Sequence, residues 1–297
     1  MQKWWSCLTN ELHTPSRPPF HALRARCTVT YPLTAIISDL HGNIPALEVA
    51  LADCRARRVE RTVCLGDVVG YGAKPRQALA LVMERCYMTT ADRVLTIEDG
   101  ICLQGNHEEA LLGSAADFNA RARRAIEWTR EELSRGEDEE RDRQYWNYVG
   151  GLLPRYTDGV AMFAHGSPRD PVREYMLPSD VNDPEKMRAN FECMEAPICF
   201  VGHSHVPAIY YEDNRFFQPK GTQGPFDLGD LDEARAIVNV GSVGQPRDGD
   251  PRLCYALFDG QYLTFVRLEY DIASAQADIR AVSDLPDELA DRLAVGR

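Results

Sequence analysis

Residues 34–42 read TAIISDLHG, a short apolar run that ends in an aspartate, a histidine and a glycine. Similar arrangements follow at 62–67 (TVCLGD), 101–107 (ICLQGNH), 160–166 (VAMFAHG) and 198–205 (ICFVGHSH). Apolar runs of this length, closed by polar residues and glycine, are typical of buried strands. The sequence therefore predicts five buried strands, each followed by a loop that carries polar side chains.

Helical patterns occupy the intervals between these runs. Residues 44–57 carry apolar side chains at helical spacing, and residues 75–85 begin with a proline and continue in the same way. After Val206 the pattern becomes rich in short strands separated by Asn, Gly and Asp, and residues 272–280 again favour a helix. This alternation predicts an α/β fold.

The chain divides into segments of different character. We expect a poorly ordered leader at 1–33, one catalytic domain at 34–280 and a polar tail at 281–297. Within the domain, residues 108–155 are rich in charged residues and helix formers, and form a helical excursion. This excursion either overhangs the functional site or is a solvated helical face without a chemical role, and the second interpretation is favoured.

Composition restricts the class of protein. A chain of 297 residues with 44% hydrophobic residues can bury a substantial core, yet it has no apolar run long enough to cross a membrane. Nine cysteines without a C-x-x-C pair argue against a disulfide framework and favour a cytoplasmic protein. The formal charge of −12 disfavours binding to long nucleic acids, which requires a basic surface.

Five of the seven histidines directly follow a predicted strand, together with two aspartates and an asparagine. Open α/β sheets build their sites at this edge, where parallel strands end. Imidazole, carboxylate and amide donors suit divalent ions such as Mn, Fe, Zn or Ni. Because the donors exceed one coordination sphere, the pattern indicates two ions.

Each of these residues also has a purely structural explanation. Asp39 or Asp67 fits a helix N-cap, a single histidine such as His165 is often a structural residue, and His203 and His205 match the alternation of a strand. A separate structural explanation would have to hold at each of the five strand ends in succession. A single metal site accounts for all of them, so the metal site is favoured.

The ordered motifs D-x-H, G-D, G-N-H-E, H-G and G-H-x-H resemble those of the calcineurin-like metallophosphoesterase superfamily, from Thr34 to about Tyr270. The resemblance implies a four-layer α/β/β/α sandwich that hydrolyses phosphate esters with a metal-bridging hydroxide. GDVVGYG at 66–72 and NVGSVGQPRD at 239–248 further resemble a bacterial branch grouped loosely with diadenosine tetraphosphatases and Ser/Thr protein phosphatases.

The resemblance also implies a role for each motif residue. One ion is expected at Asp39, His41 and His205, the other at Asn106, His165 and His203, with Asp67 bridging both. His107 is expected to donate to the substrate or leaving oxygen, and Asn106 to contact the substrate as well. Apart from the resemblance, Glu108 is interpreted either as a residue that supports the ligands from behind or as an acidic residue at a helix N-terminus, and not as a metal ligand.

The chain departs from the protein phosphatases of this superfamily, which carry G-D-x-x-D-R-G. Here Gly70 and Tyr71 replace the aspartate that orients the histidine and the arginine that grips phosphate. Arg247 is either a substitute for that arginine or a surface turn residue, and Asp248 fits a turn cap. Tyr71 either stacks on a leaving group or covers the sheet end.

These observations predict a hydrolase of small, nucleotide-like phosphate mono- or diesters, whose expected partner is that ester and not a long nucleic acid or a membrane. A phosphoprotein phosphatase is the alternative within the enzyme class. A non-catalytic scaffold is the alternative outside it, which the complete set of apparent ligands argues against.

Overall fold

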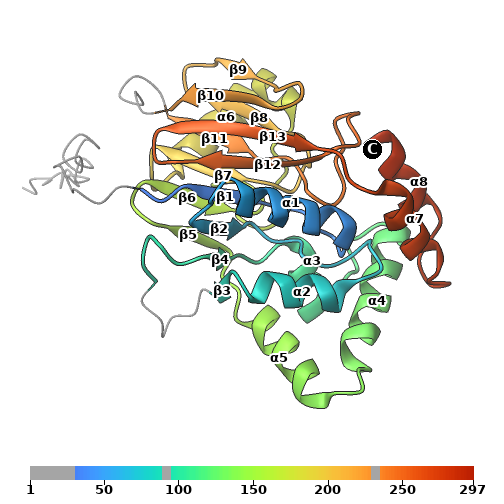
Figure 1. The fold of residues 1–297 in the computed structure, drawn as a ribbon. Coiled ribbons are helices and arrows are strands. Elements are labelled where there is room, and N and C mark those ends of the chain that lie inside the picture. Colours follow the sequence, from blue (N-terminus) through green and yellow to red (C-terminus); the bar gives the residue numbers. More distant parts are fainter. Residues whose placement is uncertain (1–30, 89–94, 229–234) are drawn as a thin grey trace, which may run out of the picture.

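The computed structural model describes residues 31–88, 95–228 and 235–297. Two β-sheets face each other at its centre (Figure 1). The first runs in the order β10-β13-β12-β1-β2-β4-β3 and comprises Gln223–Asp227, Tyr262–Leu268, Leu253–Phe258, Thr34–Ile37, Arg61–Cys64, Ile101–Cys102 and Tyr87–Met88. β1, β2, β4 and β3 are parallel, and β12 joins β1 in the antiparallel sense.

The second sheet runs in the order β5-β6-β7-β11-β8-β9. Its strands are Arg155–Thr157, Ala161–Ala164, Ile198–Val201, Ala236–Asn239, Ala208–Tyr211 and Phe216–Phe217. β6, β7 and β11 are parallel, so their carboxyl ends meet at one edge. Both sheets therefore contain a block of parallel strands, which antiparallel strands join on one side in the first sheet and on both sides in the second.

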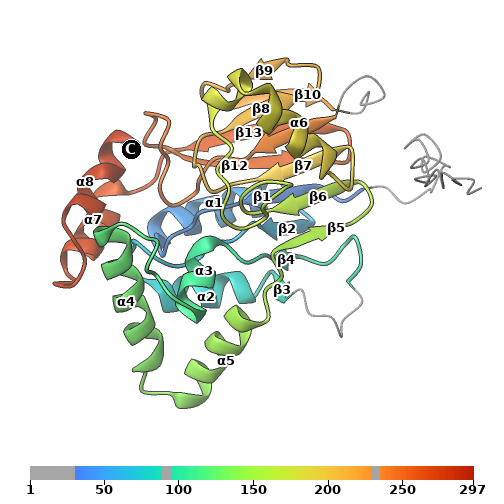
Figure 2. The same cartoon turned by 180° about the vertical axis from the view of Figure 1, so that it is seen from behind.

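Helices cover the outer face of each sheet. The α-helices are α1 (Ile44–Ala56), α2 (Pro75–Met83), α3 (Asn106–Leu112), α4 (Ala120–Ser134), α5 (Glu139–Gly150), α6 (Pro184–Glu192), α7 (Ile272–Arg280) and α8 (Glu288–Asp291), with 3-10 turns at Pro178–Asn182 and Arg292–Val295. Helices α1 and α2 flank the first sheet, and α6 covers the second (Figure 2). None of the helices in the described chain is long and apolar enough to cross a lipid bilayer.

Alternating side chains on the central strands build the layers. In β1, Ala35 and Ile37 pack under the helices while Ile36 points between the sheets. In β7, Phe200 faces the first sheet and Cys199 faces α6. The layers therefore stack in the order helix, sheet, sheet and helix, which confirms the predicted four-layer α/β/β/α sandwich.

The five strands expected from the sequence form as β1, β2, β4, β6 and β7, and the helices predicted at 44–57, 75–85 and 272–280 form as α1, α2 and α7. The short strands β3 and β5, strand β10 and helix α6 were not predicted. The short strands carry too few residues to show a period, and β10 contains a proline and mostly exposed side chains.

Both ends of the predicted domain differ from the structure. Residues 1–30 of the expected leader lie outside the described residues, but Tyr31 is buried and its hydroxyl donates to Asp158 Oδ2 at 2.8 Å. The expected polar tail at 281–297 instead folds into α8 and a 3-10 turn. It buries Leu285, Leu289 and Leu293 against α7 and α4, because these leucines recur every four residues and form an apolar stripe.

The excursion at 108–155 consists of most of α3, then α4 and α5 (Figure 1). It is not solvated throughout, because Ile126, Leu133 and Tyr148 are buried and the Tyr148 hydroxyl donates to the Cys86 carbonyl at 2.9 Å. The loop before α4 reaches the functional site, as described below.

Candidate metal centre

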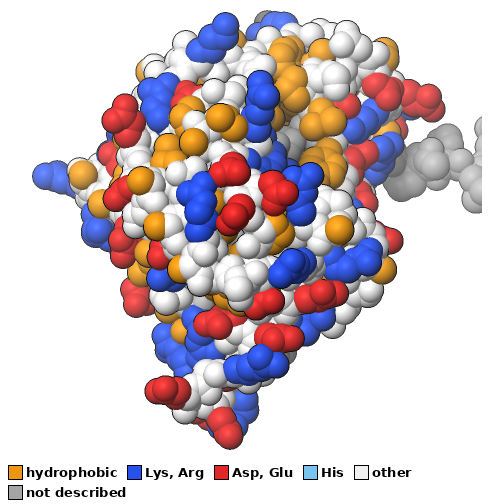
Figure 3. Space-filling view, turned by 90° about the vertical axis from the view of Figure 1, so that its right-hand side faces the viewer, with side chains coloured by type: hydrophobic (Ala, Val, Ile, Leu, Met, Phe, Trp, Pro, Cys, Tyr) orange, Lys and Arg blue, Asp and Glu red, His pale blue; other side chains and the backbone are white. Residues whose placement is uncertain are grey.

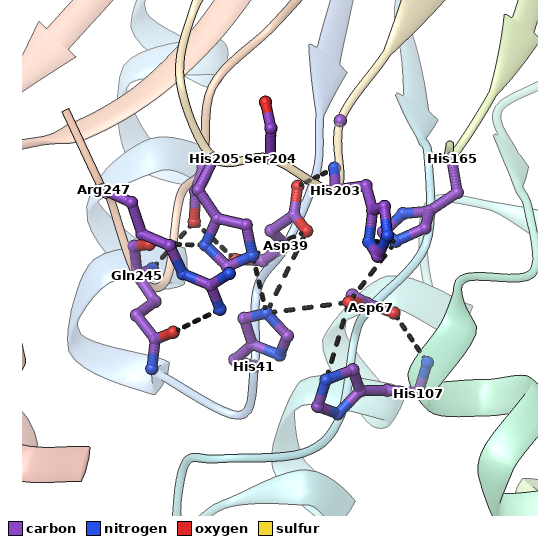
Figure 4. A network of polar contacts seen from close by, with 12 residues as sticks. Asp39, His41, Asp67, His107, His165, His203, Ser204, His205, Gln245 and Arg247 are labelled. Atoms are coloured by element: carbon purple, nitrogen blue, oxygen red, sulfur yellow. Dashed lines mark hydrogen bonds and ion pairs between the residues drawn. The ribbon is translucent and has the colours of Figure 1, made fainter. Parts of the chain in front are cut away.

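The carboxyl ends of five parallel strands deliver the predicted ligands to one edge of the sandwich (Figure 4). Asp39 and His41 follow β1, Asp67 follows β2, and Asn106 begins α3 after β4. His165 follows β6, while His203 and His205 follow β7. Every ligand-bearing side chain predicted from the sequence is brought to the same place.

The backbone is unusual at these positions. Among the described residues, eight other than glycine have a positive φ, and six of them belong to the candidate site: Asp39, His41, Asp67, Tyr71, His203 and His205. Such residues each cost roughly 1–3 kcal/mol and persist where the surroundings hold them. Backbone strain is therefore concentrated at the strand ends that carry the donors.

One group of donors consists of Asp39, His41, Asp67 and His205, whose ligand atoms lie within 4.8 Å of one another. His205 Nε2 is 3.1 Å from Asp39 Oδ1 and 3.3 Å from His41 Nε2. His41 Nε2 is 3.7 Å from Asp67 Oδ2. All four side chains are buried.

The other group consists of Asp67, His165 and His203, again within 4.8 Å. His165 Nε2 lies 3.4 Å from Asp67 Oδ2 and 3.1 Å from His203 Nδ1. The same nitrogen is 3.1 Å from Asn106 Oδ1, which adds the amide oxygen to this group. Asp67 is thus common to both groups.

These distances fit divalent ions. Ligand atoms bound to one ion at about 2.0–2.2 Å lie roughly 3 Å or slightly more apart, as the atoms do here. Asp39 Oδ1 is buried without a hydrogen-bond partner, and the ring nitrogens of His41 and His205 face each other. A cation between them would satisfy these atoms, so the residues present fit a metal.

Main-chain carbonyls orient the imidazoles. In three of the four candidate ligand histidines the ring nitrogen that faces away from the centre lies next to a carbonyl: His41 Nδ1 at 3.1 Å from Val69 O, His205 Nδ1 at 2.5 Å from Gln245 O, and His203 Nε2 at 3.1 Å from Arg173 O. The corresponding nitrogen of His165, Nδ1, is buried without a hydrogen-bond partner. An N–H donated to such a carbonyl leaves the opposite nitrogen unprotonated and free to bind metal.

Glu108 holds the loop around Asp67 in place through hydrogen bonds to its backbone. Its carboxylate accepts hydrogen bonds from the backbone N–H groups of Asp67 (2.8 Å), Gly105 (3.0 Å) and Val69 (3.2 Å). Burial, reinforced by the Asp67 charge, raises the pKa of Glu108 to about 7. Its carboxylate contacts backbone rather than the ligand groups, as a supporting residue would.

His107 lies beside the centre but outside both ligand groups. Its Nε2 is 3.9 Å from Asp67 Oδ2, and its buried Nδ1 has no hydrogen-bond partner. Gly70 explains how the ring fits, because a Cβ built there would lie 1.9 Å from His107 Nδ1. The imidazole therefore takes the space that a side chain at position 70 would need.

Tyr71 and Arg247 both stand next to the ligands. The Tyr71 ring is 4.7 Å from the His41 ring and 4.5 Å from the His107 ring, which makes it a wall of the centre. Arg247 projects on the His205 side, and its Nη2 donates to Gln245 Oε1 at 2.8 Å (Figure 4). Asp248 does not serve as a simple turn cap, because it pairs with buried Arg267.

Burial sets the protonation of most of the imidazoles. It lowers the pKa of His107 to about 4 and that of His203 to about 3, and it also lowers the pKa of His41 and His205. His165 is the exception, since the Asp67 carboxylate outweighs burial and raises its pKa to about 9. Neutral imidazole is the form that binds a metal, so three of the four candidate ligand histidines, all except His165, favour the required state.

An open pocket of about 240 Å³ leads to the centre. Asn106 and His203 form its floor, and Tyr71, Phe118 and Tyr175 form its aromatic walls. Tyr175 stacks on the His203 ring at 3.7 Å between centroids. Phe118 comes from the loop of the excursion that precedes α4, so part of that segment does overhang the site.

The fold and the donor set define a metal-dependent phosphoesterase architecture. The chain belongs to the calcineurin-like phosphoesterase superfamily, because the model of that domain matches residues 33–261. It carries clustered aspartates and histidines that are able to hold metal ions.

Two relatives resemble the chain over nearly its whole length. The crystal structure of a metallophosphoesterase from Sphaerobacter thermophilus is 38% identical, with a TM-score of 0.70, covering 90% of this chain and 99% of that one. The uncharacterised protein MJ0912 of Methanocaldococcus jannaschii is 32% identical over 274 residues, 89% of this chain and 98% of its own length. A hypothetical protein, PH1004 from Pyrococcus horikoshii, shares the fold at 19% identity and a TM-score of 0.64 over 89% of this chain and 98% of its own.

Several residues near the centre were not predicted from the sequence. Phe118, Tyr175 and Arg173 line the pocket, and Arg292 approaches Tyr71 with its Cζ 5.8 Å from the ring centroid. The repeat of Leu285, Leu289 and Leu293 was the available signal that Arg292 belongs to a packed segment. Nothing in the local sequence marks Phe118 or Tyr175.

Proposed function

We propose that the chain is a two-ion phosphoesterase that hydrolyses small phosphate mono- or diesters. The observation that carries the proposal is the Asp67 carboxylate, which belongs to both groups of donors. Divalent ions held there would activate water at neutral pH and polarise the phosphoryl oxygens. Mn, Fe, Zn and Ni all accept this set of nitrogen and oxygen donors.

The chain's own residues then position the ester and the departing group. A neutral His107 offers one N–H, and its ring lies beside the shared carboxylate, where it can donate to the leaving oxygen. Asn106 lines the pocket as well as approaching His165, so its amide is available to a phosphoryl oxygen. Arg247 adds a positive charge on the His205 side.

A small substrate is favoured by the dimensions and charge of the site. The pocket of about 240 Å³ is smaller than those that enclose drug-sized ligands, and its aromatic walls suit a flat group such as a base. On the face that carries α7 and α8, acidic and basic side chains are interspersed rather than gathered into a basic surface (Figure 3). This distribution suits a small ester better than a long nucleic acid.

A reducing compartment suits the thiols. The cysteines of the described residues are all free, and Cys193 is exposed. Free thiols persist in the cytoplasm, which is where we place the activity.

The test is a screen of the metal-free chain with added Mn²⁺, Fe²⁺, Zn²⁺ or Ni²⁺ against bis-nitrophenyl phosphate, nitrophenyl phosphate, nucleotides and a phosphopeptide. We expect metal-dependent hydrolysis of small esters that His165→Ala abolishes. Asp180→Asn is the control, because Asp180 pairs with Lys186 and belongs to neither group of donors. Preferred turnover of the phosphopeptide would favour a protein phosphatase, and metal binding without any turnover would favour a scaffold.

A further inference from the structure

Two arginines from distant parts of the chain converge on the Tyr71 ring. The Cζ of Arg247 lies 5.7 Å from the ring centroid and the Cζ of Arg292 lies 5.8 Å from it. Tyr71 itself has φ +62 and contacts the His41 and His107 rings. Two guanidinium groups therefore approach the ring that forms a wall of the metal centre, and the Arg247 charge acts on Arg292.

Neither guanidinium is paired with an aspartate or glutamate side chain. Within residues 31–88, 95–228 and 235–297, no aspartate or glutamate oxygen lies within 4.0 Å of either one, whereas most other arginines near the site have such a partner. The neighbouring Asp248 is occupied by Arg267. No acidic side chain therefore balances either charge, and Arg292 has only the carboxyl group of Arg297 beside its Nε.

Few of their N–H groups are used. Arg247 donates through Nη2 to Gln245 Oε1 at 2.8 Å, and its buried Nε has no hydrogen-bond partner. Arg292 donates through Nε to a terminal carboxyl oxygen of Arg297, which leaves its two NH2 groups without a protein partner among the described residues. Since a guanidinium has five N–H donors, most remain available to a ligand.

The fold brings the positive charges of Arg247 and Arg292 near each other although they repel. Partial burial, together with the Arg247 charge, lowers the pKa of Arg292 to about 10. The packing of Leu289 and Leu293 against α7 fixes the turn that carries Arg292, so the side chain is brought to Tyr71 by the core and not by a free tail. An anion between the arginines would remove this repulsion.

The pair lies beside the metal ligands and not among them. Neither guanidinium is within 4.0 Å of a carboxylate oxygen of Asp39 or Asp67, which are buried under the imidazoles. The Arg247 backbone N–H, however, donates to His205 O at 3.2 Å, so the pair is next to the centre. An anion bound by Arg247 and Arg292 would therefore be adjacent to a phosphoryl group bound at the metal centre.

We propose that Arg247 and Arg292 form a second anion subsite that takes a non-scissile phosphoryl group, so that the preferred substrate carries two phosphoryl groups, as in a phosphoanhydride or a bisphosphate. This inference rests on the proposed function, which supplies the first phosphoryl position. Guanidinium forks suit phosphate because two parallel N–H groups match two of its oxygens.

Calorimetric titration of the Mn²⁺-loaded chain tests the subsite without requiring turnover. The probes are methylphosphonate, with one phosphoryl group, and methylenediphosphonate and propylenediphosphonate, with two, at a constant excess of free Mn²⁺. We expect Arg292→Ala to weaken at least one diphosphonate by about tenfold or more, since charge-assisted hydrogen bonds are lost, and to change methylphosphonate by less than about twofold. Arg292→Gln, which keeps the stem, covers the case in which Arg292→Ala fails to fold.

Arg124→Ala is the matched control, because it removes an exposed arginine that faces the same C-terminal segment through Asp284. It should leave the affinity of all three probes unchanged. Unchanged diphosphonate affinity in Arg292→Ala or Arg292→Gln would overturn the subsite, as would equal weakening of methylphosphonate. Because binding is measured, loss of the subsite is distinguished from failure of the proposed hydrolysis, which would appear only as absent turnover.

Discussion

Gly70 is the residue that makes room for His107, and Gly70→Ala should inactivate the chain without touching a metal ligand. A Cβ at this position lies 1.9 Å from His107 Nδ1 and 2.8 Å from Cε1, so the imidazole has to move. The ligand groups at Asp39 and His165 do not contact Gly70. We therefore expect both donor groups to persist while His107 leaves its position.

Gly70→Ala is expected to lower both the stability of the fold and the rate of hydrolysis. Gly70 has φ +85, so alanine costs about 1–2 kcal/mol of stability through the backbone alone. Loss of a positioned proton donor lowers the rate by roughly 10²- to 10⁴-fold, equivalent to about 3–5 kcal/mol in the activation free energy. Gly249→Ala isolates the backbone cost in stability, because Gly249 has φ +84 and no atom within 4 Å of the added Cβ.

The assay compares kcat/KM for an alkyl phosphate ester in the two variants, with bound metal and thermal unfolding measured on the same samples. Both variants should lose similar stability and keep their metal, but only Gly70→Ala should lose the rate. Full activity of Gly70→Ala would refute the placement of His107 against Gly70, and an equal loss of rate in Gly249→Ala would reduce the effect to general destabilisation.

Three further substitutions test individual roles. Asp67→Asn should lower the metal content of both donor groups and abolish turnover, since the carboxylate is shared; two retained ions with full turnover would remove it from that role. His107→Asn should keep both ions and lose about 10²- to 10⁴-fold on alkyl esters but less on nitrophenyl esters, which need no proton; metal lost in proportion to rate would make His107 a ligand. The wild-type chain should hydrolyse bis-nitrophenyl phosphate, a diester, with a kcat/KM at least as high as that for nitrophenyl phosphate, a monoester. If Arg247 replaces the missing arginine, the monoester should be preferred instead, and Arg247→Ala should remove that preference. A monoester preference that survives Arg247→Ala would contradict both expectations.

The strands and the donors were predictable from the sequence because each signal is local. An apolar run such as TAII predicts a buried strand by itself, and the polar residue after it must lie at the strand's carboxyl end. The parallel pairing of β1 and β2 then brings Asp39 and Asp67 together, whereas His165 joins them because β6 of the second sheet ends at the same edge of the sandwich. The family resemblance supplied the assignment of donors to two ions.

The surroundings of the centre were not predictable because they depend on packing between distant segments. Tyr175 meets His203 across a loop, and Phe118 reaches His107 from the segment before α4. Arg292 was assigned to a polar tail because the charges in that stretch obscured its leucines. Its position depends on the contact of Leu293 with the cluster formed by α7 and α4, which only the folded chain reveals.

Titration of Mn²⁺ into the metal-free chain, with bound ion and hydrolysis of bis-nitrophenyl phosphate followed together, tests the two-ion centre most directly. Two ions should bind per chain, and activity should rise as the second donor group fills, because Asp67 joins the two groups. Full activity at one bound ion per chain, or hydrolysis by the metal-free chain, would contradict a two-ion phosphoesterase.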